Sequence, residues 1–97
     1  MVDVIKVKAM PGYRLWLAFS DGSEGIADLS ADISHGGEMV DALADQAEFA
    51  RVFVEEGVPT WPNGFDVDAI ALYMGLREAG QLKRRLAAEL AENASAR

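Results

Sequence analysis

Asp66 and Asp68 are the side chains whose type and spacing come closest to a catalytic or metal-binding arrangement in this sequence. Two carboxylates separated by one residue can share a divalent cation, and a small metal-dependent enzyme would be built around such a pair. A structural role explains them more simply, because the pair follows the Asn63-Gly64 turn and precedes a helical pattern. Asp66 can accept hydrogen bonds from turn amides, and Asp68 can cap the helix and face the positive end of its dipole. We therefore expect neither a metal site nor a cofactor.

Nucleophilic and phosphate chemistry are not indicated either. His35 is the only histidine, and it lies beside Gly36 and Gly37 in a polar stretch, so the neighbouring Ser34 gains no catalytic triad from it. The absence of cysteine excludes disulfides, thiolate nucleophiles and cysteine-ligated metal centres. The glycines match neither a dinucleotide-binding nor a phosphate-binding loop. These observations predict a protein that is not an enzyme.

Acidic residues are concentrated in the middle of the chain. The net charge is −7, but residues 21–76 contain twelve acidic residues against one base, Arg51, which gives −11 for that segment, while residues 1–20 and 77–97 each carry +2. Either the basic ends lie against the acidic middle within the fold, or the acidic middle forms a face that binds a basic partner protein. The overall negative charge makes nucleic acid an unfavourable partner.

The first thirty residues have the alternation of an antiparallel β-meander. Apolar residues alternate with polar ones over residues 5–9, and a second alternation runs over residues 13–19. The Asp21-Gly22 dipeptide that follows is typical of a hairpin turn with positive φ at both residues. Ile26 and Leu29 mark a third, shorter strand.

The rest of the chain predicts helices and short extended segments. Helical spacing over residues 39–44 precedes Asp45, which can cap a short turn carrying Phe49. Residues 51–55 and 58–62 are expected to be extended. With 97 residues, of which 51% are hydrophobic, the chain has the size and composition of one globular α+β domain. No stretch is apolar for the length of a signal peptide or a membrane span, so we expect a cytoplasmic protein.

Leucines recur at helical spacing after Asp66 and predict a long C-terminal helix, or two helices broken at Gly80. A small sheet cannot cover so long an apolar stripe, so we expect it to pack against a partner protein or a second copy of the chain in a homodimer. A dimeric DNA-binding regulator that uses the basic residues beside the stripe is the alternative. The expected interface residues are Leu76, Leu82, Leu86, Leu90, Arg77, Lys83, Arg84 and Arg85.

Three groups of short motifs together resemble a known family. They are Phe19-Ser20-Asp21-Gly22-Ser23 with Gly25 and Asp28-Leu29-Ser30; Phe49 with Val52 and Val54; and Trp61-Pro62-Asn63-Gly64 with Asp66 and Leu72-Tyr73. In this order, over roughly residues 4–73, they resemble the bacterial domain-of-unknown-function family 2442. Trp61 is expected either to fill the core, with its indole N–H bonded to a carbonyl, or to anchor an interface.

The resemblance implies an α+β fold without an established activity. Members of that family are often encoded beside another small protein, which suggests toxin–antitoxin-like pairs, and some append a helix-turn-helix domain, for which the 24 residues after Tyr73 leave no room. We interpret residues 1–75 as the family-like domain and residues 76–97 as its helical extension. The leading hypothesis is a non-enzymatic protein-interaction module, the antitoxin-like half of a two-protein system.

Overall fold

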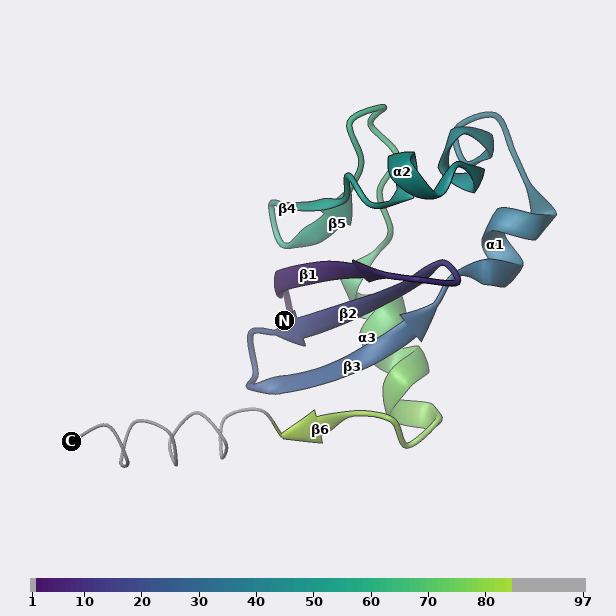
Figure 1. Ribbon diagram of the computed structural model, residues 1–97. Coiled ribbons are helices and arrows are strands. Elements are labelled where there is room, and N and C mark those ends of the chain that lie inside the picture. The colour runs from purple at the N-terminus through teal and green to yellow at the C-terminus, as the bar shows by residue number, and fades with distance from the viewer. Residues whose placement is uncertain (1, 85–97) are drawn as a thin grey trace.

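A four-stranded antiparallel sheet forms the centre of the computed structural model, which describes residues 2–84, and helix α3 crosses behind it (Figure 1). The strand order is β1-β2-β3-β6, and a separate hairpin, β4-β5, lies above the β1 edge. The predicted α+β class and N-terminal meander are confirmed. The strands are β1 (Val4–Met10), β2 (Arg14–Phe19), β3 (Ser23–Asp28), β4 (Phe53–Glu55), β5 (Val58–Thr60) and β6 (Lys83–Arg84); the helices are α1 (Ser30–His35), the 3-10 turn η1 (Asp41–Ala44), α2 (Gln46–Phe49) and α3 (Ala69–Glu78).

The β2-β3 hairpin turns at the predicted dipeptide but with a different backbone geometry. The amide of Gly22 donates to the carbonyl of Phe19 at 3.1 Å, and Gly22 has φ of 90°. Asp21 does not have positive φ, so the expected turn with positive φ at both residues is wrong. The three-residue loop instead places a single glycine in the left-handed region, which is the next most common hairpin connection.

Strand β2 contributes the largest part of the core. Leu15, Leu17 and Phe19 are fully buried on the face toward α3, while Trp16 lies on the opposite, outer face. The register pairs Trp16 with Lys8 on β1 and Ile26 on β3, so these three side chains form a row across the outer face. One polar face and one buried face are normal for an antiparallel sheet.

The predicted third strand is present as β3, and packing decides which of its residues face the core. Ala27 and Gly25 face the core, and Ile26 is 41% exposed on the outer face. The reason is close packing by α3. A Cβ atom built at Gly25 would lie 3.0 Å from a methyl group of Leu76 and 3.2 Å from the carbonyl oxygen of Gln81. A bulky residue such as Ile26 therefore has no room on the inner face.

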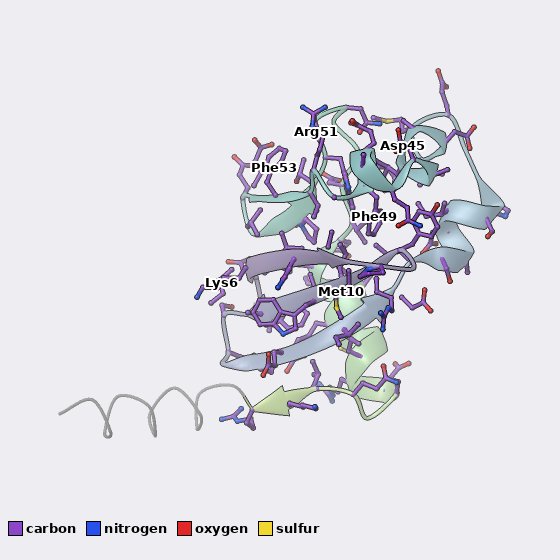
Figure 2. All side chains as sticks on the ribbon, viewed as in Figure 1. Lys6, Met10, Asp45, Phe49, Arg51 and Phe53 are labelled. Carbon is purple, nitrogen blue, oxygen red and sulfur yellow. The ribbon has the colours of Figure 1, made fainter. Side chains whose placement is uncertain are left out.

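Of the helix predicted over residues 39–44, only the 3-10 turn η1 forms, and the short helix α2 follows it; α1, which no pattern in the sequence predicts, precedes both. The cap expected at Asp45 is confirmed, because its carboxylate accepts from the amide of Ala47 at 2.9 Å. The phenol of Tyr13, in the β1-β2 turn, donates to the carbonyl of Ala44 at 2.5 Å and joins η1 to the sheet. Figure 2 shows Phe49 reaching from α2 toward the sheet, where its ring meets that of Tyr13 edge to face at 5.5 Å.

The prediction of one continuous C-terminal helical stripe is wrong. Helix α3 ends at Glu78, Gly80 has φ of 69°, and the chain then forms β6, which pairs with β3. The break expected at Gly80 is present, but a strand follows it in place of a second helix. Arg85, Leu86 and Leu90 lie outside the described residues, and so does the rest of the expected extension over residues 76–97 after Arg84.

Gly25 in β3 and Gly75 in the neighbouring helix α3 make a matched pair for stability measurements. Gly25→Ala places a methyl group against Leu76 and a backbone carbonyl, and overpacking of this kind costs about 1–3 kcal/mol. Gly75→Ala in α3 meets nothing within 4 Å and should stabilise the fold by up to about 1 kcal/mol. Urea denaturation of both variants checks this prediction, which fails if Gly25→Ala is as stable as the parent.

Candidate functional site

Asp66 and Asp68 lie near the start of α3 without forming a metal centre. The Asp68 carboxylate accepts from the amide of Ile70 at 3.2 Å, which confirms the predicted cap. The turn amide of Phe65 is bound by Asn63 Oδ1 at 3.0 Å rather than by Asp66, whose backbone bridges to Thr60. Within residues 2–84, no group of three or more histidine or acidic side chains is placed to hold a metal ion.

The Trp61-Pro62-Asn63-Gly64 segment forms a tight loop closed by its own backbone. The amide of Trp61 donates to the carbonyl of Phe65, and the amide of Gly64 donates to the carbonyl of Trp61, both at 2.9 Å. Gly64 has φ of 90°, which glycine adopts at little cost. The Asn63 amide donates to the carbonyl of Met39 at 2.9 Å, so this loop is tied to the segment between α1 and η1.

Trp61 belongs to the core. Its exposed fraction is 1%, and its indole N–H donates to the carbonyl of Phe49 at 2.8 Å. The ring centroids of Phe49 and Phe65 each lie 5.7 Å from that of Trp61, so aromatic side chains from α2 and from the loop after β5 pack together. The interpretation of Trp61 as a core residue is confirmed, and the interpretation as an exposed anchor is wrong.

Asp21 and Tyr73, from the two ends of the family-like pattern, are bonded to each other. The Tyr73 hydroxyl donates to Asp21 Oδ2 at 2.7 Å, and the amide and hydroxyl of Ser23 donate to Asp21 Oδ1 at 2.9 and 2.6 Å. Burial raises the pKa of Asp21, but these hydrogen bonds outweigh it and hold the pKa below its ordinary value. The same bond to Asp21 raises the pKa of Tyr73. The pair joins the β2-β3 hairpin to α3 and has the contacts of a structural clamp.

An apolar cavity of about 240 Å³ lies between the short helices and the loop that follows β5. The aromatic rings of Phe49, Trp61 and Phe65 form one wall. Aliphatic side chains from α1, η1 and the flanking loops form the rest, and Asp32, Asp66 and Asp68 also line the cavity. Its aliphatic lining residues are Leu29, Ile33, Val40, Leu43 and Val67.

The surroundings of this cavity are strongly acidic. We define the acidic lobe as residues 30–50 and 61–68, which contain seven carboxylates and neither lysine nor arginine. Asp41, Asp45 and Asp68 accept hydrogen bonds from backbone amides. Glu48 forms an ion pair at 3.1 Å with Arg51, which lies just outside the lobe. Within the described part of the chain, the side-chain carboxylates of the remaining three, Asp32, Glu38 and Asp66, form neither a hydrogen bond nor an ion pair.

A second hollow lies on the outer face of the sheet around Trp16. It measures about 590 Å³ and is wide and shallow. The indole N–H of Trp16 donates to Glu24 at 2.6 Å, and opposite charges face each other across neighbouring strands: Arg14 pairs in register with Asp28, and Glu24 with Lys83. Around this hollow the charges are therefore matched in pairs, apart from Lys8, which lies beside Trp16 on the same face and adds a positive charge.

The described residues of the expected interface, which are Leu76, Arg77, Leu82, Lys83 and Arg84, do not form one surface. Leu76 is 5% exposed inside the core, and Leu82 packs against the core from the segment before β6. Lys83 and Arg84 are neighbours in a strand, so their side chains point to opposite faces of the sheet rather than along one helix. Arg84 lies on the side of Asp21 and Tyr73, whose pKa values it lowers, while Arg77 is exposed near the end of α3.

Comparison with known protein families assigns the chain to one of them. The model of a family described as protein of unknown function (DUF2442) matches residues 4–78. The chain belongs to this family. The match includes all the motif residues discussed above, from Phe19 to Tyr73, and ends with α3. No curated protein and no solved structure matches the chain. Within the described residues, none of the helices has the length and apolar character needed to cross a membrane.

Sequence reasoning missed the cavity and the part that Asp32 plays in it. The motif residues Trp61 and Asp66 were recognised, but the opposite wall comes from α1 and η1, whose sequence carries no motif. The excess of carboxylates over residues 30–50 was visible as charge. The sequence does not indicate that this segment lies against the Trp61 loop. In the structure a hydrogen bond between Asn63 and Met39 joins the two segments.

The clamp between Asp21 and Tyr73 predicts a pH-dependent effect. Because the folded-state pKa of Asp21 lies below the ordinary value of 3.8, its contribution to stability is complete above that value and is lost as the pH falls through the folded-state pKa. Asp21→Asn should therefore be less stable than the parent near neutral pH, and the difference should shrink in acid. Urea midpoints across this range test it, with Asp32→Asn as the matched control. A constant difference at all pH values would contradict it.

Gly64 predicts a larger effect on stability. Gly64→Val forces a β-branched residue into the left-handed region at φ of 90°, and we expect a loss of a few kcal/mol, roughly the upper range for single substitutions. Pro62→Ala, at an exposed position of the same loop, is the control and should cost far less. Thermal or urea unfolding measures both, and an unchanged midpoint for Gly64→Val would refute the structural account of this loop.

Proposed function

We propose that this protein is a non-enzymatic protein-interaction module whose acidic lobe binds a small basic protein. The observation that carries the proposal is an open apolar cavity lined by three carboxylates, within two segments that hold seven carboxylates and neither lysine nor arginine. Apolar contact supplies affinity in protein interfaces, while charge of one sign selects the partner and speeds the encounter. The acidic lobe offers both in the same place.

The partner proposed here is the other half of a two-protein system, with this chain as the acidic, neutralising member. The pairing that the family resemblance implies, in which members are often encoded beside another small protein, supports this role, and so does the small size of the domain. A cytoplasmic setting and the absence of a cofactor belong to the same proposal. An enzymatic role has no comparable support, because the polar side chains of Asp68 and Asn63 are used for a helix cap and a turn.

The alternative of a dimeric DNA-binding regulator has less support. It depended on a helix that presents Lys83 and Arg84 together with Arg77, and the first two lie in the edge strand β6. Lys83 also faces Glu24 in the register of the sheet. A surface of this kind does not offer the continuous basic patch that binding to DNA phosphates requires.

Co-purification from the native host with charge-reversed variants tests the proposal. The full chain should form a stable complex with one small basic protein, and the complex should weaken as salt is raised. Glu38→Lys with Asp66→Lys reverses two carboxylates of the lobe that have no bonding role, and this variant should lose the partner while keeping its unfolding midpoint. The control is Glu55→Lys with Glu56→Lys in the β4-β5 hairpin. Equal capture of the same protein by both double variants would refute the role of the lobe.

A further inference from the structure

We infer that the cavity of the acidic lobe is an anchor site for a single apolar side chain, of the size of leucine or phenylalanine, carried on a basic segment of the partner protein. This inference rests on the proposed function, since it names what the partner inserts. The inference names the cavity as the site and one apolar side chain as its occupant, which the charge of the lobe alone does not give.

The volume and lining of the cavity fit one side chain. An apolar cavity of about 150 Å³ holds a benzene ring, and the cavity here measures about 240 Å³. Three of its lining side chains are almost fully buried, since Leu43 and Trp61 are each 1% exposed and Phe49 is 2% exposed. Aromatic rings in a pocket of this kind favour contact with aliphatic and aromatic side chains.

The cavity is held open by contacts that do not involve its occupant. One wall is the Trp61 loop, closed by its own backbone bonds, and the other is the segment between α1 and η1. Asn63 joins the two walls through the carbonyl of Met39, and Tyr13 joins η1 to the sheet through Ala44. A site that is already formed costs little ordering on binding, which favours the insertion of a side chain.

The carboxylates of the cavity specify the charge next to the inserted side chain. Asp32 lies on α1 at one side and Asp66 on the loop at the other, and within residues 2–84 neither is engaged by a hydrogen bond or an ion pair. Exposed ion pairs contribute little each, so the apolar anchor provides most of the affinity and the flanking cations fix its orientation. An arginine or lysine on each side of the anchor residue meets both carboxylates.

The outer face of the sheet does not offer an equivalent site. Its hollow around Trp16 is larger, but Arg14 and Lys83 are matched there by Asp28 and Glu24 in the register of the strands. A basic segment would meet like charges on that face. The charges therefore direct a basic partner to the acidic lobe.

Titration of the full chain with synthetic peptides tests the inference. The probe is a short peptide in which one leucine is flanked on both sides by arginines, and the readout is the set of backbone amide shifts in the ¹⁵N–¹H spectrum. Shifts should concentrate on residues lining the cavity, including Ile33, Phe65 and Val67. Replacing the leucine of the peptide by alanine should weaken binding about tenfold, as expected for the loss of a buried leucine.

Two variants of the protein complete the experiment. Ile33→Phe adds volume at the wall of the cavity and should weaken the leucine peptide about tenfold, whereas Ile26→Phe on the outer sheet face should not. If Ile33→Phe proves unstable, Asp32→Asn with Asp66→Asn replaces it, because these exposed carboxylates lie outside the core. The double variant should bind less tightly at low salt and become equal to the parent at high salt.

The outcomes separate this inference from the proposed function. Binding of the leucine and alanine peptides with equal affinity at the acidic lobe would overturn the anchor site and leave the interaction module intact. Shifts centred on Trp16 would overturn the location of the site. Absence of binding by either peptide, together with failure to co-purify a basic protein, would overturn both. Dimerisation of the chain in competition with the leucine peptide would show that a second copy occupies the cavity, against the inference.

Discussion

The hydrogen bond from the indole of Trp61 to the carbonyl of Phe49 is the contact on which the upper part of the structure depends. It joins α2 to the loop after β5, two segments that form no strand pairing with each other. A buried N–H without a partner would be costly, so the bond fixes where the indole lies and how the two segments approach. The rings of Phe65 and Tyr13 extend this contact to the start of α3 and to the sheet.

The family motifs are explained largely by this architecture. Asp21 and Tyr73 close the hairpin against α3, Trp61 fills the core, and Asn63 with Gly64 shapes a loop. Such residues are constrained because each completes a bond between distant segments. The motif therefore identifies the fold, and the functional surface has to be sought beside it.

The acidic lobe is where the requirements of folding and binding differ. A domain of this size gains stability from a continuous core, yet the packed rings of Phe49, Trp61 and Phe65 border a cavity that its own side chains leave open. The surrounding carboxylates repel one another and add little to stability. Both features are unfavourable for the isolated chain and become favourable when a basic, partly apolar segment is bound.

Local pattern determined much of this protein. The alternation over β2, the place of the turn after it and the caps at Asp45 and Asp68 follow from neighbouring residues and their spacing, and the sequence predicts them correctly. It also offers the burial of Trp61 as one of two interpretations, but it does not give the geometry of the turn. The excess of negative charge in the middle of the chain is equally a property of the sequence. The family follows from the order of its short motifs.

Tertiary packing decided the rest. The face on which Ile26 lies depends on the approach of α3 to Gly25, and the change from helix to strand after Gly80 depends on the free edge of β3, neither of which is encoded nearby. The cavity is enclosed by α1, η1 and the loop after β5, which are distant in the sequence, and a hydrogen bond joins Asn63 to Met39, 24 residues away. Periodicity reports which side of an element is apolar, but it carries no information about which distant segment will cover that side.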